Sequence, residues 1–560
     1  MFCGIFIVSL LAARPAWAES APAAIASAHP DATRAGFEVL EKGGNAFDAA
    51  IAVAATLSVV EPTGSGLGGG GFWLLHRESD KKQVMIDGRE RAPAASTADM
   101  YLDKNGDPVP GASLYGALAA GIPGTPAAID HLARHYGLLP LRTSLAPAIR
   151  AAEEGFAAYP RYIRILESRL KYLTPAAQKI FLAPDGSLPV EGTLIRQPEL
   201  AETLRQLARH GRDGFYSREV GRKLVSSVRR QGGIWTRLDL DDYRVIERDP
   251  VIGEYRDARL IMSPPPSSGG VAIMQMLGML DTLEYAGLDA RQRRQKVIEV
   301  MRRAYRDRSL YMGDPDYTRI DLDKLLATDY LDELAAGIGD EASPVETPVE
   351  ARAKGSDTTH FSIIDADGNR VAATLSLNYY FGSGIVAEGT GVTLNNEMDD
   401  FATRPGTGNV WGLTGQQANA IAPGKRPLSS MTPSFIERGD EVVVIGTPGG
   451  SRIITMVLLA MLDYLHSDSS VGDWVALPRY HHQYRPDVVQ FEPGAIGEDE
   501  QFDLESKGYV LQERERSYGN MQAIWMNRRT GEMRAASDPR NQGKAEVRLI
   551  ESLSNVASMN

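Results

Sequence analysis

The chain has 560 residues, of which 43% are hydrophobic and 24% are charged, a composition that excludes disordered and collagen-like proteins. Its formal net charge of −12 disfavours nucleic-acid binding, which normally requires a basic surplus. The single cysteine, Cys3, excludes an intramolecular disulfide, a CxxC redox pair and a thiolate zinc site.

The N-terminus has the pattern of a secretory signal peptide. An apolar run over residues 5–13 is followed by Ala16-Trp17-Ala18, which matches the A-x-A pattern of a cleavage site. We therefore expect residues 1–18 to be removed and the product to be periplasmic or secreted. The alternative is a short buried helix. No other segment reaches the ~20 apolar residues that span a bilayer, so no membrane span is expected.

The first half of the chain is predicted to be mainly helical. Helices are expected over residues 32–40 and 46–60, and Asn45 is a suitable cap for the second. Residues 115–245 are mostly helical in pattern. After a cluster of prolines and glycines at residues 263–270, a further helical stretch runs to about residue 312.

A glycine-rich run at residues 64–71 contains the pattern G-x-G-x-x-G, which occurs in dinucleotide sites. Such a site requires a strand before the glycines and a helix after them. Here a helix precedes the run, and strand-like residues 72–75 follow it. We therefore expect these glycines to let the backbone pass close to another element, or to line a pocket, and we do not expect a nucleotide cofactor.

The pattern becomes β-rich at Thr358. Residues 337–357 lack apolar periodicity and are predicted to form an exposed connector. Strands are expected at residues 358–364 and 371–377, joined by a hairpin turn at Asp367-Gly368-Asn369. Further strands are expected at residues 391–394, 434–437 and 441–445, and a helix from near Arg452.

Two short motifs are interpreted as structural. Ser168 and Lys171 match S-x-x-K, but no S-D-N or K-T-G partner follows at a suitable spacing, which indicates a solvated helix face. His481-His482 has no H-E-x-x-H context and no carboxylate three or four residues on, which favours a packing role over metal binding. No metal and no cofactor are expected.

Thr358 follows the connector directly and begins the hairpin. A threonine hydroxyl is a poor nucleophile without an adjacent base, and its own α-amino group, with a pKa of about 7.7–8.0, can serve. That arrangement requires cleavage of the chain just before Thr358. By itself, a Thr-Thr pair in a strand is weak evidence for such chemistry.

Longer motifs surround Thr358 in a distinctive order, and they extend over essentially the whole mature chain. They are residues 43–50, 66–71, Arg89 with Ala92-Pro93, 264–270, 313–316, Asp357-Thr358-Thr359-His360, Ser376 with Asn378, 395–401, 426–433, 446–452, 478–483 and 536–540. Together these strings closely resemble the γ-glutamyltransferase (γ-glutamyltranspeptidase, glutathione hydrolase) family of N-terminal-nucleophile hydrolases.

The resemblance implies an α+β fold, the four-layer αββα sandwich, in which a large and a small subunit share one core. It implies that the precursor cleaves itself into a large subunit, residues 19–357, and a small subunit, residues 358–560. Thr358 would attack the γ-amide carbonyl of glutathione or a related γ-glutamyl compound. The resulting γ-glutamyl-enzyme would pass its acyl group to water, or to an acceptor amino acid or dipeptide.

The resemblance also implies the site residues. Ser376 matches a position that is usually threonine and supports the nucleophile, and serine keeps the hydroxyl. Gly449 and Gly450 match the oxyanion-hole pair. The positions that hold the substrate match Arg89, Ser429 and Ser430 for its α-carboxylate, and Asn378, Glu397 and Asp400 for its α-ammonium. Residues 404–413 match a lid loop in which Trp411 closes over the pocket; the alternative is an exposed tryptophan in a flexible loop.

Three other functions are weighed against this interpretation. The match at Asp400 argues against a glutaryl-type cephalosporin acylase, because the substrate of such an enzyme lacks the α-amine. A poly-γ-glutamate-processing relative could share every residue named. Outside the family, an uncleaved periplasmic binding protein would show neither cleavage nor turnover.

Overall fold

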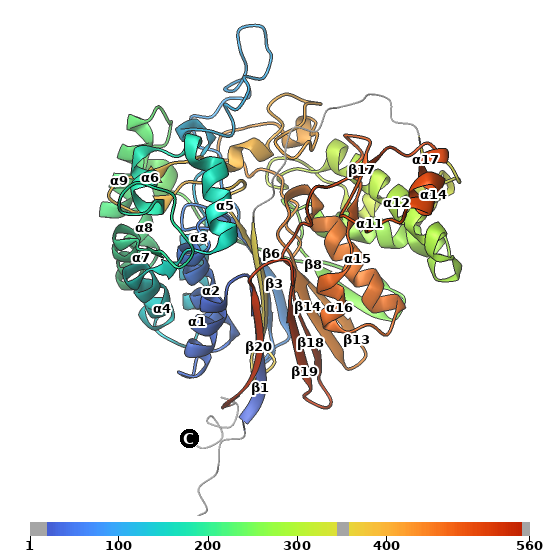
Figure 1. The fold of residues 1–560 in the computed structure, drawn as a ribbon, viewed down its shortest axis with the longest axis horizontal. Coiled ribbons are helices and arrows are strands. Elements are labelled where there is room, and N and C mark those ends of the chain that lie inside the picture. The colour runs from blue at the N-terminus through green and yellow to red at the C-terminus, as the bar shows by residue number, and fades with distance from the viewer. Residues whose placement is uncertain (1–19, 344–357, 552–560) are drawn as a thin grey trace, which may run out of the picture.

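The computed structural model describes residues 20–343 and 358–551, which form a four-layer αββα sandwich (Figure 1). The predicted signal peptide, its cleavage site and residues 344–357 of the predicted connector lie outside the described residues. No helix among the described residues is long and apolar enough to cross a membrane.

Two antiparallel sheets form the inner layers. The seven-stranded sheet has the order β20 (Lys544–Glu551), β1 (Ser20–Ser27), β9 (Thr359–Ile364), β10 (Arg370–Ser376), β2 (Gly70–Arg77), β3 (Lys82–Gly88) and β6 (Ile246–Arg248). The six-stranded sheet has the order β19 (Met533–Ser537), β18 (Gln522–Asn527), β14 (Glu441–Gly446), β13 (Ser434–Arg438), β8 (Ala258–Met262) and β7 (Val251–Tyr255). Each sheet takes strands from both sides of Thr358, so the two predicted subunits share their hydrophobic core.

Helices cover the outer face of each sheet (Figure 1). Beside the seven-stranded sheet lie α1 (Pro30–Leu40), α2 (Ala46–Val60), α3 (Thr125–His135), α4 (Leu141–Glu154), α5 (Pro160–Arg169), α6 (Pro175–Phe181), α7 (Pro198–His210), α8 (Arg212–Tyr216) and α9 (Glu219–Arg230). Beside the six-stranded sheet lie α11 (Gly269–Thr282), α12 (Ala290–Tyr311), α14 (Thr328–Ala336), α15 (Ile453–His466), α16 (Val471–Ala476) and α17 (Glu498–Ser506). The remaining short helices are α10 (Arg237–Asp241) and α13 (Leu322–Leu325).

The remaining strands form two pairs and one three-stranded sheet. The pairs are β4 (Phe156–Ala157) with β5 (Leu194–Ile195) and β11 (Val386–Ala387) with β12 (Val392–Thr393), and the sheet has the order β15 (Tyr480–His481), β16 (Val489–Phe491) and β17 (Leu511–Glu513). The predicted strand over residues 391–394 is therefore shorter than expected, whereas those at 434–437 and 441–445 are confirmed by β13 and β14.

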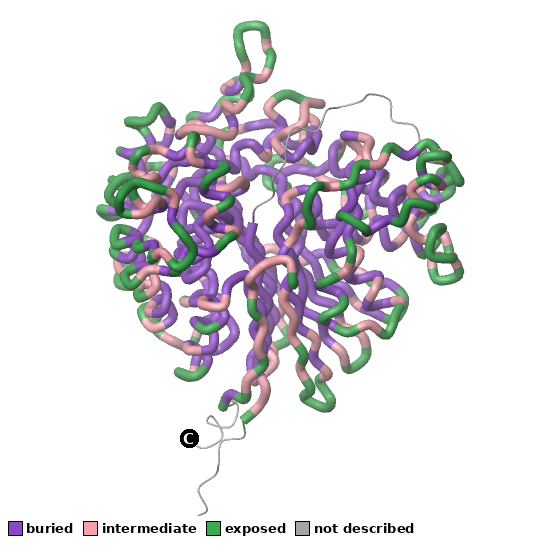
Figure 2. Tube along the Cα trace, viewed as in Figure 1, coloured by how far each residue is buried: buried purple, intermediate pink, exposed green. Residues whose placement is uncertain are grey.

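The central strands are buried on both faces, as the purple core of Figure 2 shows. In β2, Trp73 and Leu75 pack with the helices of the first layer, while Phe72 and Leu74 pack against the second sheet. Because side chains alternate along a strand, burial on both faces requires the continuous apolar run that the sequence has there.

The predicted cap at Asn45 and the predicted hairpin turn are both present. The Asn45 side chain accepts hydrogen bonds from the backbone nitrogens of Phe47 and Asp48, which begins α2 at the expected residue. At the turn from β9 to β10, the Asp365 carboxylate accepts from the backbone nitrogen of Asn369 at 2.8 Å, and Gly368 has φ +91°. This tight hairpin fixes the pairing of β9 with β10.

Candidate active site

The β-hairpin places Thr358 opposite Ser376. Thr359 pairs with Leu375 and His360 with Thr374, so the same register carried one residue further brings Thr358 to Ser376 at the end of β10. The Thr358 Oγ1 and Ser376 Oγ atoms are 3.3 Å apart, and both residues are buried. Ser376 Oγ also accepts a hydrogen bond from the Asn378 backbone nitrogen at 2.7 Å, which holds the hydroxyl beside Thr358.

The glycine-rich run lets β2 approach this point closely. A Cβ atom on Gly69 would lie 2.1 Å from the carbonyl oxygen of Ser376, and one on Gly71 would lie 2.4 Å from that of Thr374. Only glycine fits at such separations. The expectation that these glycines permit close backbone approach is therefore confirmed.

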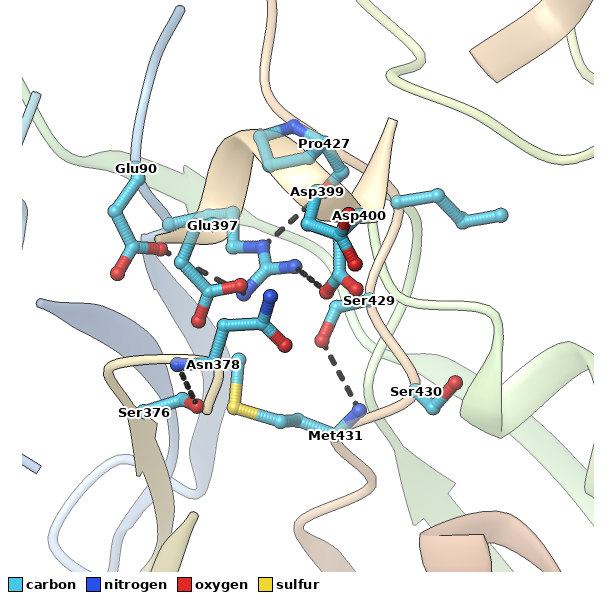
Figure 3. Close-up of polar contacts among 12 residues, drawn as sticks. Glu90, Ser376, Asn378, Glu397, Asp399, Asp400, Pro427, Ser429, Ser430 and Met431 are labelled. Carbon is cyan, nitrogen blue, oxygen red and sulfur yellow. Dashed lines mark hydrogen bonds and ion pairs between the residues drawn. The ribbon is translucent and has the colours of Figure 1, made fainter. Parts of the chain in front are cut away.

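Arg89 is the centre of a buried charge cluster. Its Nη1 lies 2.9 Å from Glu397 Oε2, its Nη2 lies 2.6 Å from Asp400 Oδ2, and its Nε donates to the Pro427 carbonyl at 3.1 Å. Figure 3 shows Glu397 and Asp400, the two ends of the 3₁₀ turn η4 (Glu397–Asp400), together with a further carboxylate, Glu90, which comes from another segment. The residue predicted to bind an α-carboxylate is thus paired with two residues predicted to bind an α-ammonium.

The carboxylates outnumber the cation in this cluster. Glu90 lies 3.6 Å from Arg89 Nη1, and neither of its oxygens has a hydrogen-bond partner among the described residues. Burial raises the pKa of Glu90 to about 8, although the charge on Arg89 acts in the opposite direction. Burial, followed by repulsion from Glu90 and Asp400, also raises the pKa of Glu397 well above its usual range. The cluster therefore has a proton-dependent charge.

The two serines predicted to bind the α-carboxylate lie on one loop beside this cluster (Figure 3). Ser429 Oγ accepts a hydrogen bond from the Met431 backbone nitrogen at 3.1 Å. Ser430 Oγ accepts from Arg308 Nη2 at 3.3 Å, and Arg308 Nε donates to Ser268 Oγ at 2.9 Å. Arg308 thus places a second buried guanidinium near the position expected for an anionic group.

The predicted oxyanion glycines begin the 3₁₀ turn η6 (Gly450–Arg452). Gly449 has φ +154° and Gly450 has φ +58°, conformations that favour glycine. Gly450 lines the same cavity as Thr358, and Gly449 precedes it directly. A Cβ on Gly450 would lie 2.9 Å from the ring of Trp411, so glycine is also required for the tryptophan to lie here.

Trp411 covers the cavity. Its indole Nε1 donates to Asn378 Oδ1 at 2.8 Å, and its carbonyl accepts from Gln483 Nε2 at 3.0 Å. Only 8% of its surface is exposed, which contradicts the alternative of an exposed loop tryptophan. With Trp411 in this position the cavity has a volume of about 20 Å³, room for about one water molecule.

The structure brings nearly all the predicted site residues together. The described residues that line this cavity include Arg89, Thr358, Ser376, Asn378, Glu397, Asp400, Trp411, Ser429, Ser430 and Gly450. Gly449 is adjacent in the chain. The sequence did not lead us to predict Glu90 and Arg308 as site residues. The position of Glu90 directly after Arg89 could have indicated the first of them.

Three buried histidines, His360, His481 and His482, contact other side chains away from the Thr358 cavity. His360 donates or accepts towards Thr374 Oγ1 at 2.8 Å inside the sheet, and burial lowers its pKa to about 3. His481 contacts Thr455 Oγ1 at 2.9 Å and His482 contacts Asp487 Oδ1 at 2.9 Å, both within the protein interior, which fits the packing role predicted for them. The described residues lining the Thr358 cavity include no histidine or lysine that could act as a base.

The family model described as gamma-glutamyltranspeptidase matches residues 32–548. The chain belongs to this family. Similar proteins include a glutathione hydrolase proenzyme of Pseudomonas sp. (strain A14), which is 41% identical over 518 residues that cover 90% of this chain and 89% of the relative. Another, from Escherichia coli (strain K12), is 38% identical over 526 residues that cover 92% of this chain and 90% of the relative.

Solved structures agree with the fold. A cephalosporin acylase from Bacillus halodurans matches with a TM-score of 0.81 and 27% identity, over 97% of this chain and 99% of that chain. A gamma-glutamyltranspeptidase from Helicobacter pylori matches with a TM-score of 0.55 and 37% identity, over 59% of this chain and 95% of that chain. The predicted family and the predicted α+β fold of the N-terminal-nucleophile hydrolases are therefore confirmed.

Proposed function

We propose that this protein is a self-processing γ-glutamyltransferase that acts on glutathione and related γ-glutamyl compounds. Cleavage between Asp357 and Thr358 would give a large subunit, residues 19–357, and a small subunit, residues 358–560. Thr358 Oγ1 would then attack the γ-amide carbonyl and form a γ-glutamyl ester while the amine leaves. Water would release glutamate from this ester, and an amino acid or dipeptide would accept the γ-glutamyl group.

The observation that carries the proposal is the position of Thr358 in the cavity. Its hydroxyl lies 3.3 Å from Ser376 Oγ, in a cavity that is also lined by Arg89, Glu397 and Asp400. A hydroxyl nucleophile thus lies beside charges of both signs. That combination suits an acyl donor whose far end is a zwitterion, as the γ-glutamyl group is.

The α-amine released by cleavage is the proposed general base. With no histidine or lysine among the described residues of the cavity wall, the amine of Thr358 is the nearest group with a suitable pKa, about 7.7–8.0. It would take the proton from Oγ1 during attack and return it to the departing amine. Backbone N–H groups at Gly449 and Gly450 would stabilise the oxyanion.

Substrate binding is proposed to exchange ion pairs within the charge cluster. Arg89 would turn from its carboxylate partners to the α-carboxylate of the substrate. Ser429 and Ser430 would bind the same α-carboxylate. Glu397 and Asp400, with Asn378, would then bind the α-ammonium. Because a zwitterion adds no net charge, each buried charge keeps a partner of opposite sign, which avoids the several kcal/mol that an unpaired buried ion costs. Trp411 would move aside as a lid to admit the substrate.

The proposed enzyme is exported after removal of residues 1–18. Since Cys3 is the only cysteine, the mature subunits would be held together without a disulfide, by packing, hydrogen bonds and ion pairs such as that between Arg89 and Asp400. The interleaved strands of both sheets provide an extensive shared core for this purpose.

The test is to compare the purified protein with a Thr358→Ala variant. The wild type is expected to give two bands on a denaturing gel and to release nitroaniline from γ-glutamyl-p-nitroanilide, faster with glycylglycine present. Thr358→Ala is expected to give one full-length band and no release. A wild type that remains one band on long incubation and turns over no γ-glutamyl donor would refute the proposal.

A further inference from the structure

A second cavity, of about 910 Å³, begins beside the oxyanion glycines. Its wall includes Pro448 and Arg452, which lie on either side of Gly449-Gly450, and Tyr380, which follows Asn378 by two residues. At about 3.8 Å per residue, the Cα atoms of Pro448 and Arg452 lie within about 8 Å of that of Gly450. The larger cavity therefore adjoins the end of the catalytic cavity where the amide bond would be broken.

Arginines from four separate segments line this cavity. They are Arg161 and Arg164 on α5, Arg452 at the end of η6, Arg514 and Arg516 just after β17, and Arg540 just after β19. The acidic residues in the wall are Glu513 and Glu515. A chain with a net charge of −12 thus gathers a concentrated positive charge at one place.

Much of this charge has no carboxylate partner. Arg540 is paired with Glu492 at 2.6 Å, and Arg161 lies 3.3 Å from Glu61. By contrast, none of the other four arginines, namely Arg164, Arg452, Arg514 and Arg516, forms an ion pair with any carboxylate that the structure describes. The cavity is therefore complementary to an anion that the described residues of the chain do not supply.

Arg452 shows this most clearly, because it is only 6% exposed. Its Nε and Nη2 both donate to the neutral Gln490 Oε1, at 3.2 and 2.6 Å, and its guanidinium lies 5.1 Å from the centre of the Tyr518 ring. Burial, followed by repulsion from Arg514, lowers the pKa of Arg452 to about 10. A buried cation held by an amide and a ring is costly unless a bound anion offsets the desolvation.

We propose that this cavity binds the leaving-group and acceptor half of the substrate through its carboxylates, and that it selects peptides that carry several of them. The inference rests on the proposed γ-glutamyl transfer. Arginine binds carboxylates in a bidentate manner, and cavities of roughly 300–1,000 Å³ hold ligands larger than a dipeptide. An acidic peptide of a few residues matches both the volume and the charge.

The test compares two acceptors of equal length, Gly-Gly with one carboxylate and Glu-Glu with three. The rate of transfer from γ-glutamyl-p-nitroanilide is divided by the rate of hydrolysis of the same donor in the same sample. This ratio corrects for differences in the amount of folded enzyme. The wild type is expected to have a higher kcat/KM for Glu-Glu. In the double variant Arg514→Gln/Arg516→Gln, the ratio of kcat/KM for Glu-Glu to kcat/KM for Gly-Gly is expected to fall about tenfold.

The matched control is Arg528→Gln/Arg529→Gln, which removes the same charge from an exposed turn outside the cavity. It is expected to keep the wild-type preference. Equal use of both acceptors by the wild type, or an equal loss in the control, would overturn the inference while leaving the transferase proposal intact. Absence of both hydrolysis and transfer would instead overturn the proposed function.

Discussion

Replacing Asp400 with asparagine tests which end of the substrate the buried carboxylates bind. Asp400 Oδ2 lies 2.6 Å from Arg89 Nη2, and its Oδ1 accepts from Asn409 Nδ2 at 3.1 Å. Asparagine keeps the size and one oxygen but removes the charge that would face an α-ammonium. A hydrogen bond to a charged group contributes about 1.5–3 kcal/mol, so kcat/KM for a γ-glutamyl donor should fall about 10- to 150-fold.

The assay compares γ-glutamyl-p-nitroanilide with glutaryl-p-nitroanilide, which has the same chain and terminal carboxylate but no α-amine. In Asp400→Asn the kcat/KM for the glutaryl donor should change little, because that donor has no α-ammonium to contact Asp400. The matched control is Asp399→Asn, since Asp399 is bound to Ser113 Oγ at 2.5 Å and to the Val410 backbone nitrogen at 2.8 Å, away from the cavity. It should not discriminate between the donors. An equal loss for both donors in Asp400→Asn would refute the assignment of this carboxylate to the α-ammonium.

Three further predictions concern the neighbours of these residues. Ser376→Ala removes the hydroxyl 3.3 Å from Thr358 Oγ1 and should slow both self-cleavage and kcat by about tenfold or more, whereas Ser376→Thr should restore them; gels and steady-state rates measure this. Trp411→Ala removes the indole hydrogen bond to Asn378 and the cover of the cavity, so KM for the γ-glutamyl donor should rise about 5- to 150-fold in initial-rate assays, and an unchanged KM would exclude a lid role. Because burial raises the pKa of Glu90 from 4.5 to about 8, its contribution to stability is complete below pH 4.5 and is lost as the pH rises through about 8. We therefore expect the Tm of Glu90→Gln to fall less than the Tm of the wild type when the pH is raised from about 5 to about 9. Equal falls in Tm would contradict the raised pKa.

Local features of the fold could be predicted because neighbouring residues determine them. The alternating pattern after Thr358 and the turn at Asp367-Gly368-Asn369 define a hairpin, and α2 begins at its expected cap, Asn45. The length of β12 was overestimated, since Gly391 and Leu394 extend the apolar pattern but do not pair in the ladder. Strand ends depend on which partner lies alongside, and a single sequence does not specify that.

That these distant residues lie together in one site could be inferred only through the family resemblance. Arg89 and Asp400 are more than three hundred residues apart in the chain, and no local pattern requires that they meet. The pairing of Arg89 with Glu397 was not foreseen either, because the two were assigned to opposite ends of the substrate. Arg308 was hidden among the arginines of α12, where only the packing of the helix distinguishes the one that faces Ser430.

The central claim, that Thr358 carries the γ-glutamyl group, is tested most directly by mass spectrometry of the protein quenched in acid during turnover of glutathione. We expect a small subunit whose first residue is Thr358, and a fraction of it heavier by one γ-glutamyl group attached to that residue. Turnover that leaves Thr358 unmodified, or that places the group on another residue, would show that Thr358 is not the nucleophile.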